Sequence, residues 1–210
     1  MRVNVVDHAR KEQGMCMHTG CNTKIGVNDP YKWIKARYGP RRVFCGLHFP
    51  RPSEMTSSDK LSVIYGARED IEDSLGVFMA ADNDSLLASL DDLVNALESG
   101  SGSVNESADE YEMSADNIEQ YFSNSPKVDE IREKAESART FADELEDARS
   151  EIDDLRSNLE EAIDLADSEV PENEQENEDV PEEPEDGSDI ESIKSDIESR
   201  VQEAIDSLDL

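Results

Sequence analysis

The charge of the chain is divided between two regions of opposite sign, and this division limits what each region can fold into. Residues 1–60 contain 11 basic and five acidic residues, a net charge of +6, whereas residues 61–210 carry −38, for a total of −32. Of the 11 aromatic residues, five lie between Tyr31 and Phe49. The acidic region therefore has few large apolar groups, and its self-repulsion opposes compaction. We expect a mainly α fold, with a small basic module followed by elongated helices.

All three cysteines and two of the three histidines lie within 33 residues. Cys16-x4-Cys21 forms one pair and Cys45-x2-His48 the other, with 23 residues between them. Two such pairs separated by a hairpin hold Zn²⁺ tetrahedrally in zinc ribbons. The odd number of cysteines argues against a disulfide framework. We therefore predict a zinc-ribbon-like site with Cys16, Cys21, Cys45 and His48 as the metal ligands.

The ligand set has alternatives. His18 lies inside the first pair and can take the place of either cysteine of that pair, and His8 is a more distant candidate. Three buried cysteines without a metal are the other interpretation of the same residues. Gly20 and Gly46 lie within or beside the pairs, where a left-handed backbone is often required. We expect both glycines to adopt the left-handed backbone conformation, with a positive φ.

A basic hairpin lies between the two ligand pairs. Residues 31–38 are rich in aromatic and β-branched side chains, Gly39-Pro40 is a turn signal, and residues 41–45 form the returning strand. Aromatic rings interleaved with cations can stack bases and bind phosphates. The alternative is that the rings form a small core and the cations are a solvated face. The predicted nucleic-acid-binding residues are Lys32, Trp33, Lys35, Arg37, Arg41 and Arg42.

Helices are predicted after the Pro50-Arg51-Pro52 segment, which ends a module placed at residues 1–55. Residues 56–124 are expected to form short helices, the first of which begins at the capping box Thr56–Asp59. Apolar residues at helical spacing predict further helices over 84–98 and 107–123. The Gly100–Ser103 segment, Gly-Ser-Gly-Ser, is expected to separate them.

A heptad pattern marks residues 126–167 as one long helix. Ten of its eleven seam positions are apolar, counted from Ile131, which predicts a coiled coil formed with another copy or within the chain. The alternative is a single amphipathic helix that packs on the chain's own short helices. The side chains expected to face the partner helix are Leu145, Ile152, Leu155 and Leu159.

The C-terminal part consists of a polar segment and a final helix. Residues 168–188 contain three prolines and no apolar period, so they are predicted to be a disordered acidic linker. Residues 189–210 carry an apolar stripe at helical spacing. Such a tethered helix can dock into a groove of a partner protein. The alternative is that it folds back on the chain's own helices.

Short motifs of the first module resemble a group of uncharacterised proteins from tailed viruses of bacteria and archaea. The motifs are Ala9-Arg10-Lys11; Gly26 with Asp29, Tyr31 and Trp33; Arg37-Tyr38-Gly39; and Pro50-Arg51-Pro52-Ser53 with Thr56. The resemblance covers about a quarter of the chain and implies no activity. Members that lack the cysteines imply that a metal here is a stabiliser. The protein is then expected in the host cytoplasm or the virion.

The acidity of the chain has two explanations. It is typical of proteins from a host with molar salt in its cytoplasm, where charges are screened within about 3 Å. Together with the resemblance, this indicates a virus of a salt-loving archaeon. The alternative is an ordinary acidic coiled coil with a disordered tail.

No catalytic set is recognised in the sequence. All four predicted ligands are protein side chains, which leaves no open position for a catalytic metal. No segment of about 18 apolar residues indicates membrane contact. We predict a non-enzymatic zinc-containing adaptor, in which the basic module contacts nucleic acid or protein and the helices bind protein partners, including copies of the chain. The alternative is a virion structural or assembly protein that acts through its coiled coil.

Overall fold

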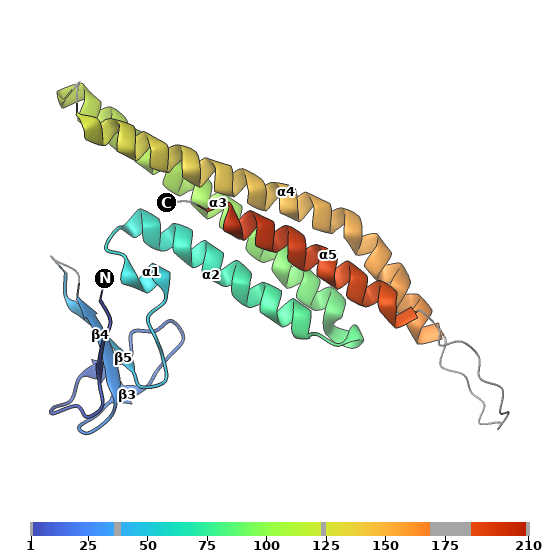
Figure 1. The fold of residues 1–210 in the computed structure, drawn as a ribbon, viewed down its shortest axis with the longest axis horizontal. Helices are drawn as coiled ribbons and strands as arrows, with labels where there is room; N and C mark the ends of the chain where they lie inside the picture. The colour runs from blue at the N-terminus through green and yellow to red at the C-terminus, as the bar shows by residue number, and fades with distance from the viewer. Residues whose placement is uncertain (1, 36–38, 123–124, 169–185, 209–210) are drawn as a thin grey trace. The chain divides into compact units, whose positions relative to one another are not determined.

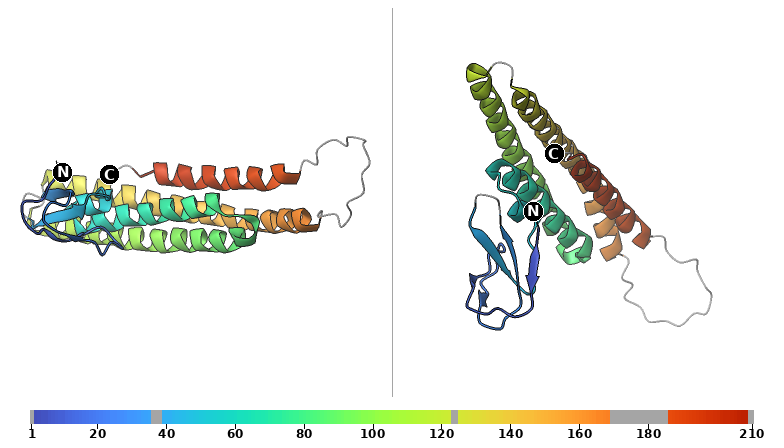
Figure 2. Two further views of the ribbon diagram at one scale, coloured as in Figure 1. Left: turned by 90° about the horizontal axis from the view of Figure 1, so that it is seen from below. Right: turned by 60° about the vertical axis from the view of Figure 1, so that its left-hand side comes forward.

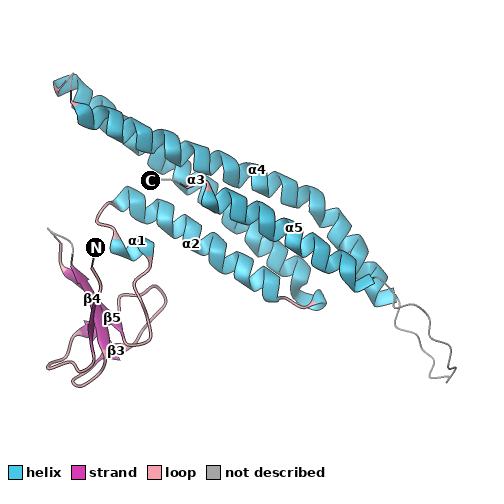
Figure 3. Ribbon diagram, viewed as in Figure 1, coloured by secondary structure: helices cyan, strands magenta, loops and turns pink. Residues whose placement is uncertain are grey.

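The structure is a computed structural model of the chain and describes residues 2–35, 39–122, 125–168 and 186–208. The chain divides into two compact units, residues 1–66 and residues 67–210. The first unit contains the β-strands and the second consists of long helices (Figures 1 and 3). This confirms the predicted mainly α fold with a small β-hairpin module at its N-terminal side.

Two small antiparallel sheets make up the β structure of the first unit. The strands are β1 (Asn4–Val6), β2 (Gly14–Met15), β3 (Lys24–Ile25), β4 (Tyr31–Lys35) and β5 (Arg41–Cys45). One sheet has the order β1-β4-β5, and the other pairs β2 with β3. The predicted hairpin is confirmed as β4 and β5, with Tyr31 paired to Cys45. The other three strands were not predicted, because two or three residues are too few to show a period of two.

The core of the first unit is small. Its eight buried members are Ala9, Cys16, Ile25, Tyr31, Ile34, Val43, Phe44 and Cys45. Two of them are predicted metal ligands, and only Phe44 and Tyr31 are aromatic. A core of this size rarely stabilises a module by itself, so small domains of this kind need a metal or another cross-link.

The strands are followed by one helical turn, α1 (Pro52–Met55), and by α2 (Asp59–Ala80), within which the first unit ends. Pro52 occupies the first position of α1, where its missing N–H is not needed. The predicted helix start at residues 56–59 is confirmed. Ser58 is the capping residue there, because its Oγ accepts a hydrogen bond from the Leu61 amide at 3.4 Å.

The second unit is built around an antiparallel helical hairpin. Besides residues 67–80 of α2, its helices are α3 (Asn83–Tyr121), α4 (Pro126–Ser168) and α5 (Asp186–Asp206). Figure 1 shows α4 alongside α3 and α5 alongside α4, in agreement with their contacts. None of the helices in the described part of the chain combines the length and apolarity that a bilayer span requires.

Ion pairs between α3 and α4 follow the antiparallel register. Arg132 contacts Asp116 and Glu119, Arg139 contacts Asp109 and Glu112, Arg149 contacts Glu98, and Arg156 contacts Asp91. These exposed pairs contribute little to stability, because water screens them. The stabilisation comes mainly from the buried apolar residues between the helices, such as Leu93 and Leu97 of α3 and Phe141 and Leu145 of α4.

The predicted helix break at residues 100–103 is wrong, because α3 continues through it without interruption. Gly100 is buried where three helices meet: a Cβ at this position would lie 3.0 Å from Ile71 Cδ1 of α2 and 3.6 Å from Leu145 Cδ1 of α4. The low helix propensity of glycine is thus outweighed by tertiary packing. Ser103 Oγ donates to the Ser99 carbonyl oxygen at 2.9 Å, which satisfies its hydroxyl inside the helix.

The long helix extends over residues 126–168, close to its predicted range. Its seam residues Leu145, Ile152 and Leu159 are fully buried, while Leu155 is half-buried. The helices that pack against α4 are α3 and α5 of the same chain. Intramolecular packing is therefore the arrangement observed, and a coiled coil with another copy stays a prediction.

The C-terminal helix folds back on the second unit, which was one of its two predicted alternatives (Figure 2). Ile197, Val201 and Ile205 are fully buried. Lys194 Nζ donates to the carbonyl oxygen of Ala81, just beyond α2, at 3.2 Å. A cation at a helix C-terminus is favourable because it meets the unpaired carbonyl groups. Most of the predicted acidic linker, residues 169–185, lies outside the described residues.

Substitution of the two helical glycines separates packing from helix propensity. Gly100→Leu should destabilise the second unit by about 1–3 kcal/mol, because the added side chain meets Ile71 and Leu145. Gly102→Leu should stabilise it by about 0.5–1 kcal/mol, because a Cβ at residue 102 meets nothing within 4 Å and only the propensity changes. The measurement is urea unfolding followed by far-UV circular dichroism. If the free energy of unfolding changes in the same direction in both variants, the close helix contact at Gly100 is contradicted.

Candidate metal centre

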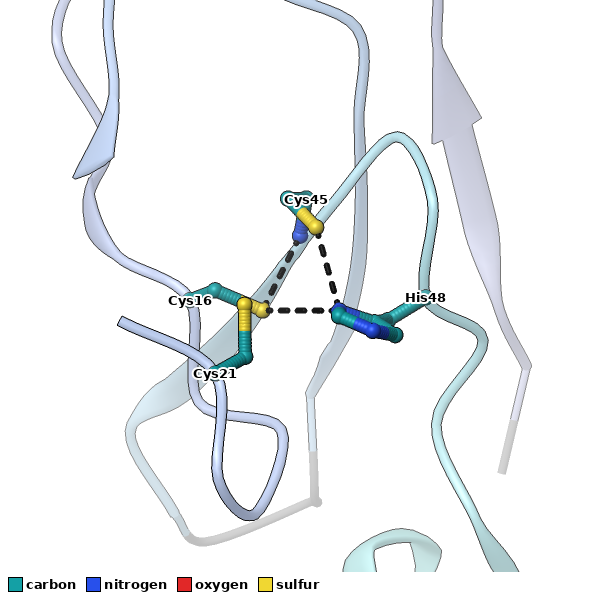
Figure 4. A group of neighbouring side chains, drawn as sticks. All are labelled: Cys16, Cys21, Cys45 and His48. Carbon is teal, nitrogen blue, oxygen red and sulfur yellow. Dashed lines mark hydrogen bonds between the residues drawn. The ribbon is translucent and has the colours of Figure 1, made fainter. Parts of the chain in front are cut away.

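The four predicted ligands converge on one point in the first unit. The Sγ atoms of Cys16, Cys21 and Cys45 and a ring nitrogen of His48 all lie within 4.8 Å of one another. Figure 4 shows the side chains turned toward a common centre. Sequence spacing thus identified the members of this cluster, which can hold a metal ion.

The first ligand pair is held by a tight turn and by the neighbouring strand. The Cys21 amide donates to the His18 carbonyl oxygen at 3.0 Å, and Gly20 between them has a φ of +76°. A residue of positive φ is required at the third position of a type II turn, and glycine adopts it without strain. The left-handed conformation predicted for Gly20 is therefore confirmed. The Cys16 amide also donates to the Thr23 carbonyl oxygen at 2.8 Å, which closes the loop.

The second pair begins at the last residue of β5. The His48 amide donates to the Cys45 carbonyl oxygen at 3.3 Å, so the chain turns back and brings the imidazole over the sulfur. Gly46 in this turn does not have the predicted positive φ. It is required for another reason: a Cβ there would lie 2.7 Å from Pro30 Cγ and 3.2 Å from the Pro30 carbonyl oxygen.

The distances within the cluster are close to those of a tetrahedral site. His48 Nδ1 lies 3.2 Å from Cys45 Sγ and 3.8 Å from Cys16 Sγ. Four ligands at about 2.0–2.3 Å from one ion would be separated from each other by about 3.5–3.8 Å. Only small movements are needed to close the group around an ion. His48 would bind through Nδ1, the ring nitrogen that faces the sulfurs.

Hydrogen-bond donors surround the sulfur atoms. The Cys45 amide donates to Cys16 Sγ at 3.3 Å, and Thr23 Oγ1 lies 3.3 Å from Cys21 Sγ. Burial raises the pKa of the Cys16 thiol. Hydrogen bonds from the side chain and the backbone of Thr23 lower the pKa of Cys21 to about 6. Cys21 is therefore ready to bind as a thiolate at neutral pH.

Neither alternative histidine belongs to the cluster. His18 stacks on the ring of His48 with a centroid distance of 4.3 Å, and its Nδ1 faces Glu54. His8 is exposed, and its Nδ1 lies 3.3 Å from the Asn28 carbonyl oxygen. The structure therefore favours the ligand set of three cysteines and His48 over the sets that include His18 or His8.

Two of the predicted nucleic-acid-binding cations are engaged inside the first unit. Lys32 is buried, with its Nζ donating to the Gly46 carbonyl oxygen at 2.5 Å and lying 4.0 Å from the centroid of the Phe49 ring. Arg42 donates to the Glu54 carbonyl oxygen at 2.6 Å. These side chains hold the segment after β5 in place, so the structure does not present them as free cations.

The remaining predicted residues are more accessible. Lys35 and Arg41 are exposed and lie opposite each other in the register of β4 and β5. The Arg41 guanidinium lies 4.3 Å from the centroid of the half-buried Trp33 ring and donates to the Tyr31 hydroxyl at 2.7 Å. Arg37 lies outside the described residues. The accessible part of the predicted surface therefore consists of Trp33, Lys35 and Arg41.

Sequence reasoning missed two residues that support the cluster. Thr23 contacts a ligand directly, and its position two residues after Cys21 is a weak signal for such a role. Glu54 contacts His18 from a distant part of the chain, and no spacing in the sequence indicates it. Neither residue was predicted, because ligand spacing indicates the possible metal ligands but not the groups that orient them.

The contact between Thr23 and Cys21 predicts an effect on metal binding. Thr23→Val should weaken metal affinity at neutral pH about 10-fold, because the hydroxyl that stabilises the thiolate is lost. The folded-state pKa of Cys21 is lowered to about 6, so its thiolate is favoured above that pH and lost as the pH falls through it. The variant should raise this pKa and release metal at a higher pH.

A colorimetric chelator assay during acid titration measures this release. Thr19→Val, at an exposed residue of the same loop, is the matched control. It should leave the pH of half-release unchanged. Equal release curves for both variants would show that the Thr23 hydroxyl has no part in the binding of the ion.

Comparison with protein-family models, with curated proteins and with solved structures gives no match to this chain. The resemblance to tailed-virus proteins therefore stays a prediction from short motifs. The function of the chain has to be inferred from the geometry of its own residues, above all from the cluster of three cysteines and His48.

Proposed function

We propose that the cluster binds one Zn²⁺ as a structural ion, and that the chain is a non-enzymatic adaptor with a zinc module and a helical protein-binding unit. The observation that carries the proposal is the convergence of Cys16, Cys21, Cys45 and His48 within 4.8 Å. Three thiolates and one imidazole are a donor set that suits Zn²⁺, whose structural sites are tetrahedral.

The number of ligands supports a structural role for the ion. Four protein donors complete a tetrahedral shell, whereas catalytic zinc sites keep one position for water or substrate. Cys16 and Cys45 are 5% and 4% exposed, so two ligands lie in the core of the first unit. Binding free energy at such a site is also folding free energy, because the small core does not hold these loops by itself.

Exposed apolar side chains support a protein-binding role for the second unit. Tyr121 and Phe122, at the end of α3, are 75% and 68% exposed, and Met113 of the same helix is also exposed. Exposed aromatic and methionine side chains can supply the apolar contacts of a protein interface. The alternative role as a virion structural or assembly protein draws on the same exposed residues, because the heptad seam of α4 is already largely buried against α3 and α5 of the chain.

The proposal predicts one zinc ion per chain in protein purified without added metal. Cys45→Ser and His48→Ala should each lose the ion and unfold the first unit, because a ligand to a folding-linked metal is removed. The α3–α4 hairpin should stay folded in both variants, since its buried residues include none of the ligands. Elemental analysis and far-UV circular dichroism measure the two effects.

His8→Ala is the matched control, because it removes a histidine that lies outside the cluster. It should keep the full zinc content. The proposal is wrong if the wild-type protein contains fewer than about 0.2 zinc ions per chain and its first unit stays folded in a chelator.

Nucleic-acid contact is a second candidate function, supported by the accessible surface of Trp33, Lys35 and Arg41. The Arg41 guanidinium and the Trp33 ring lie together on the β4–β5 hairpin. Cations and aromatic rings lie together in this way on surfaces that stack bases and bind phosphates. Trp33 is the only tryptophan in the chain, so its fluorescence reports on this surface alone.

Titration of the full chain with single-stranded DNA tests this candidate. Lys35→Ala with Arg41→Ala should weaken binding and lower the slope of log affinity against log salt by about 0.7 for each removed cation. Arg10→Ala with Lys11→Ala removes the same charge from exposed residues outside the hairpin and is the control. Absence of any Trp33 quenching at low salt, or equal effects of the two double variants, would exclude the hairpin as the binding surface.

A further inference from the structure

Glu54 makes an unusual set of contacts beside the metal centre. His18 Nδ1 lies 3.3 Å from both oxygens of its carboxylate, and the two side chains are only 14% and 11% exposed. The same carboxylate accepts hydrogen bonds from the Arg51 amide at 2.8 Å and from the Thr19 amide at 3.3 Å. Glu54 therefore connects α1 to the loop that carries the first ligand pair.

The contact with Glu54 fixes the tautomer and the position of His18. A carboxylate only accepts hydrogen bonds, so the proton of His18 must be on Nδ1. The His18 ring is then held against His48, with a centroid distance of 4.3 Å and 18° between the planes. His18 is not among the residues whose ligand atoms converge on the cluster, so the carboxylate holds its ring beside the ligand His48 as a neighbour that orients it.

The His48 ring needs such a support because the residues on either side of it are exposed. Leu47 is 88% exposed and Phe49 is 64% exposed, so neither neighbour anchors the imidazole by burial. The hydrogen bond from the His48 amide to the Cys45 carbonyl oxygen sets the turn of the backbone but does not set the rotation of the His48 ring. The described contacts of the ring itself are those with the sulfurs of Cys16 and Cys45 and with His18.

We propose that Glu54 is the positioning residue of the metal centre: it holds His18 against the His48 ring, which selects a site of three cysteines and one histidine and links the bound ion to the folding of α1. This inference rests on the proposed zinc function. It explains why His18, inside the first ligand pair, is excluded from the metal shell. It also connects the ion to Arg42, which donates to the Glu54 carbonyl oxygen.

Cobalt titration of the full chain tests the proposal, because the visible absorption of Co²⁺ reports the identity and geometry of its ligands. Glu54→Gln should weaken Co²⁺ affinity at least about 10-fold and change the d–d absorption, since the His48 ring loses its support and His18 is released. His18→Phe keeps a stacking ring without the bond to Glu54. It should preserve the spectrum of three sulfurs and one nitrogen while weakening affinity less than Glu54→Gln does.

Glu12→Gln is the matched control, because Glu12 is an exposed carboxylate that pairs with Lys24 in the same unit. It should leave affinity and spectrum unchanged. Hydrogen exchange adds a second readout: removal of metal from the wild type should expose the Arg51 and Met55 amides, which are bonded around Glu54 in α1.

The outcomes separate this inference from the zinc proposal. Wild-type protein that binds no Co²⁺ would overturn both. Wild-type binding together with a Glu54→Gln variant of the same affinity and spectrum would overturn the positioning role alone. If Glu54→Gln fails to fold, His18→Phe decides: its loss of the wild-type spectrum would contradict a role of stacking in holding His48.

Discussion

The first unit depends on the convergence of three sulfur atoms and one imidazole, because its other interactions are few. Its β2 and β3 strands contain two residues each, and its buried core has eight members. Cys16 and Cys45 belong both to this core and to the cluster, so packing and metal binding constrain the same atoms. Burial raises the pKa of Cys16, so without metal this sulfur keeps its proton in the core. In the proposed site a bound ion would displace that proton, which would link metal binding to both folding and pH.

The second unit depends on a different constraint, the close approach of long helices that carry few large side chains. Gly100 lets α2 and α4 come near α3, and small residues such as Ser101, Ser107 and Ala108 are buried along the same helix. Close backbone approach compensates for the small size of the side chains, since dispersion contacts depend on distance. The arginines of α4 then meet the acidic residues of α3 along the edges of the contact. These ion pairs favour one antiparallel register over others more than they add to stability.

The sequence predicted the cluster of possible metal ligands and the long helices because both leave a local signal. Cys16-x4-Cys21 and Cys45-x2-His48 show their role through spacing, and the seam of α4 shows its role through a repeat of seven. Gly100 was misinterpreted because its local propensity favours a break, whereas the side chains that surround it come from residues 67, 71 and 145. Lys32 and Arg42 were predicted to face a ligand, but the carbonyl groups they bind belong to residues 46 and 54. The contact of Glu54 with His18 could not be found, because these two residues are brought together only by the fold.

The distribution of charge bears on the choice between a nucleic acid and a protein as the partner. The net charge of +6 in residues 1–60 overstates the free positive surface, since Lys32 and Arg42 bind backbone carbonyls and Lys24 pairs with Glu12. Two accessible cations on the hairpin, Lys35 and Arg41, can neutralise only about two phosphates, which gives weak and salt-dependent binding. A nucleic acid that approaches this chain also meets the repulsion of residues 61–210, which carry −38. A protein with a basic surface meets attraction from the same residues, and exposed Tyr121 and Phe122 offer it apolar contacts. For the proposed adaptor role, the charges of the whole chain therefore favour a protein over a nucleic acid as the partner of the helical unit.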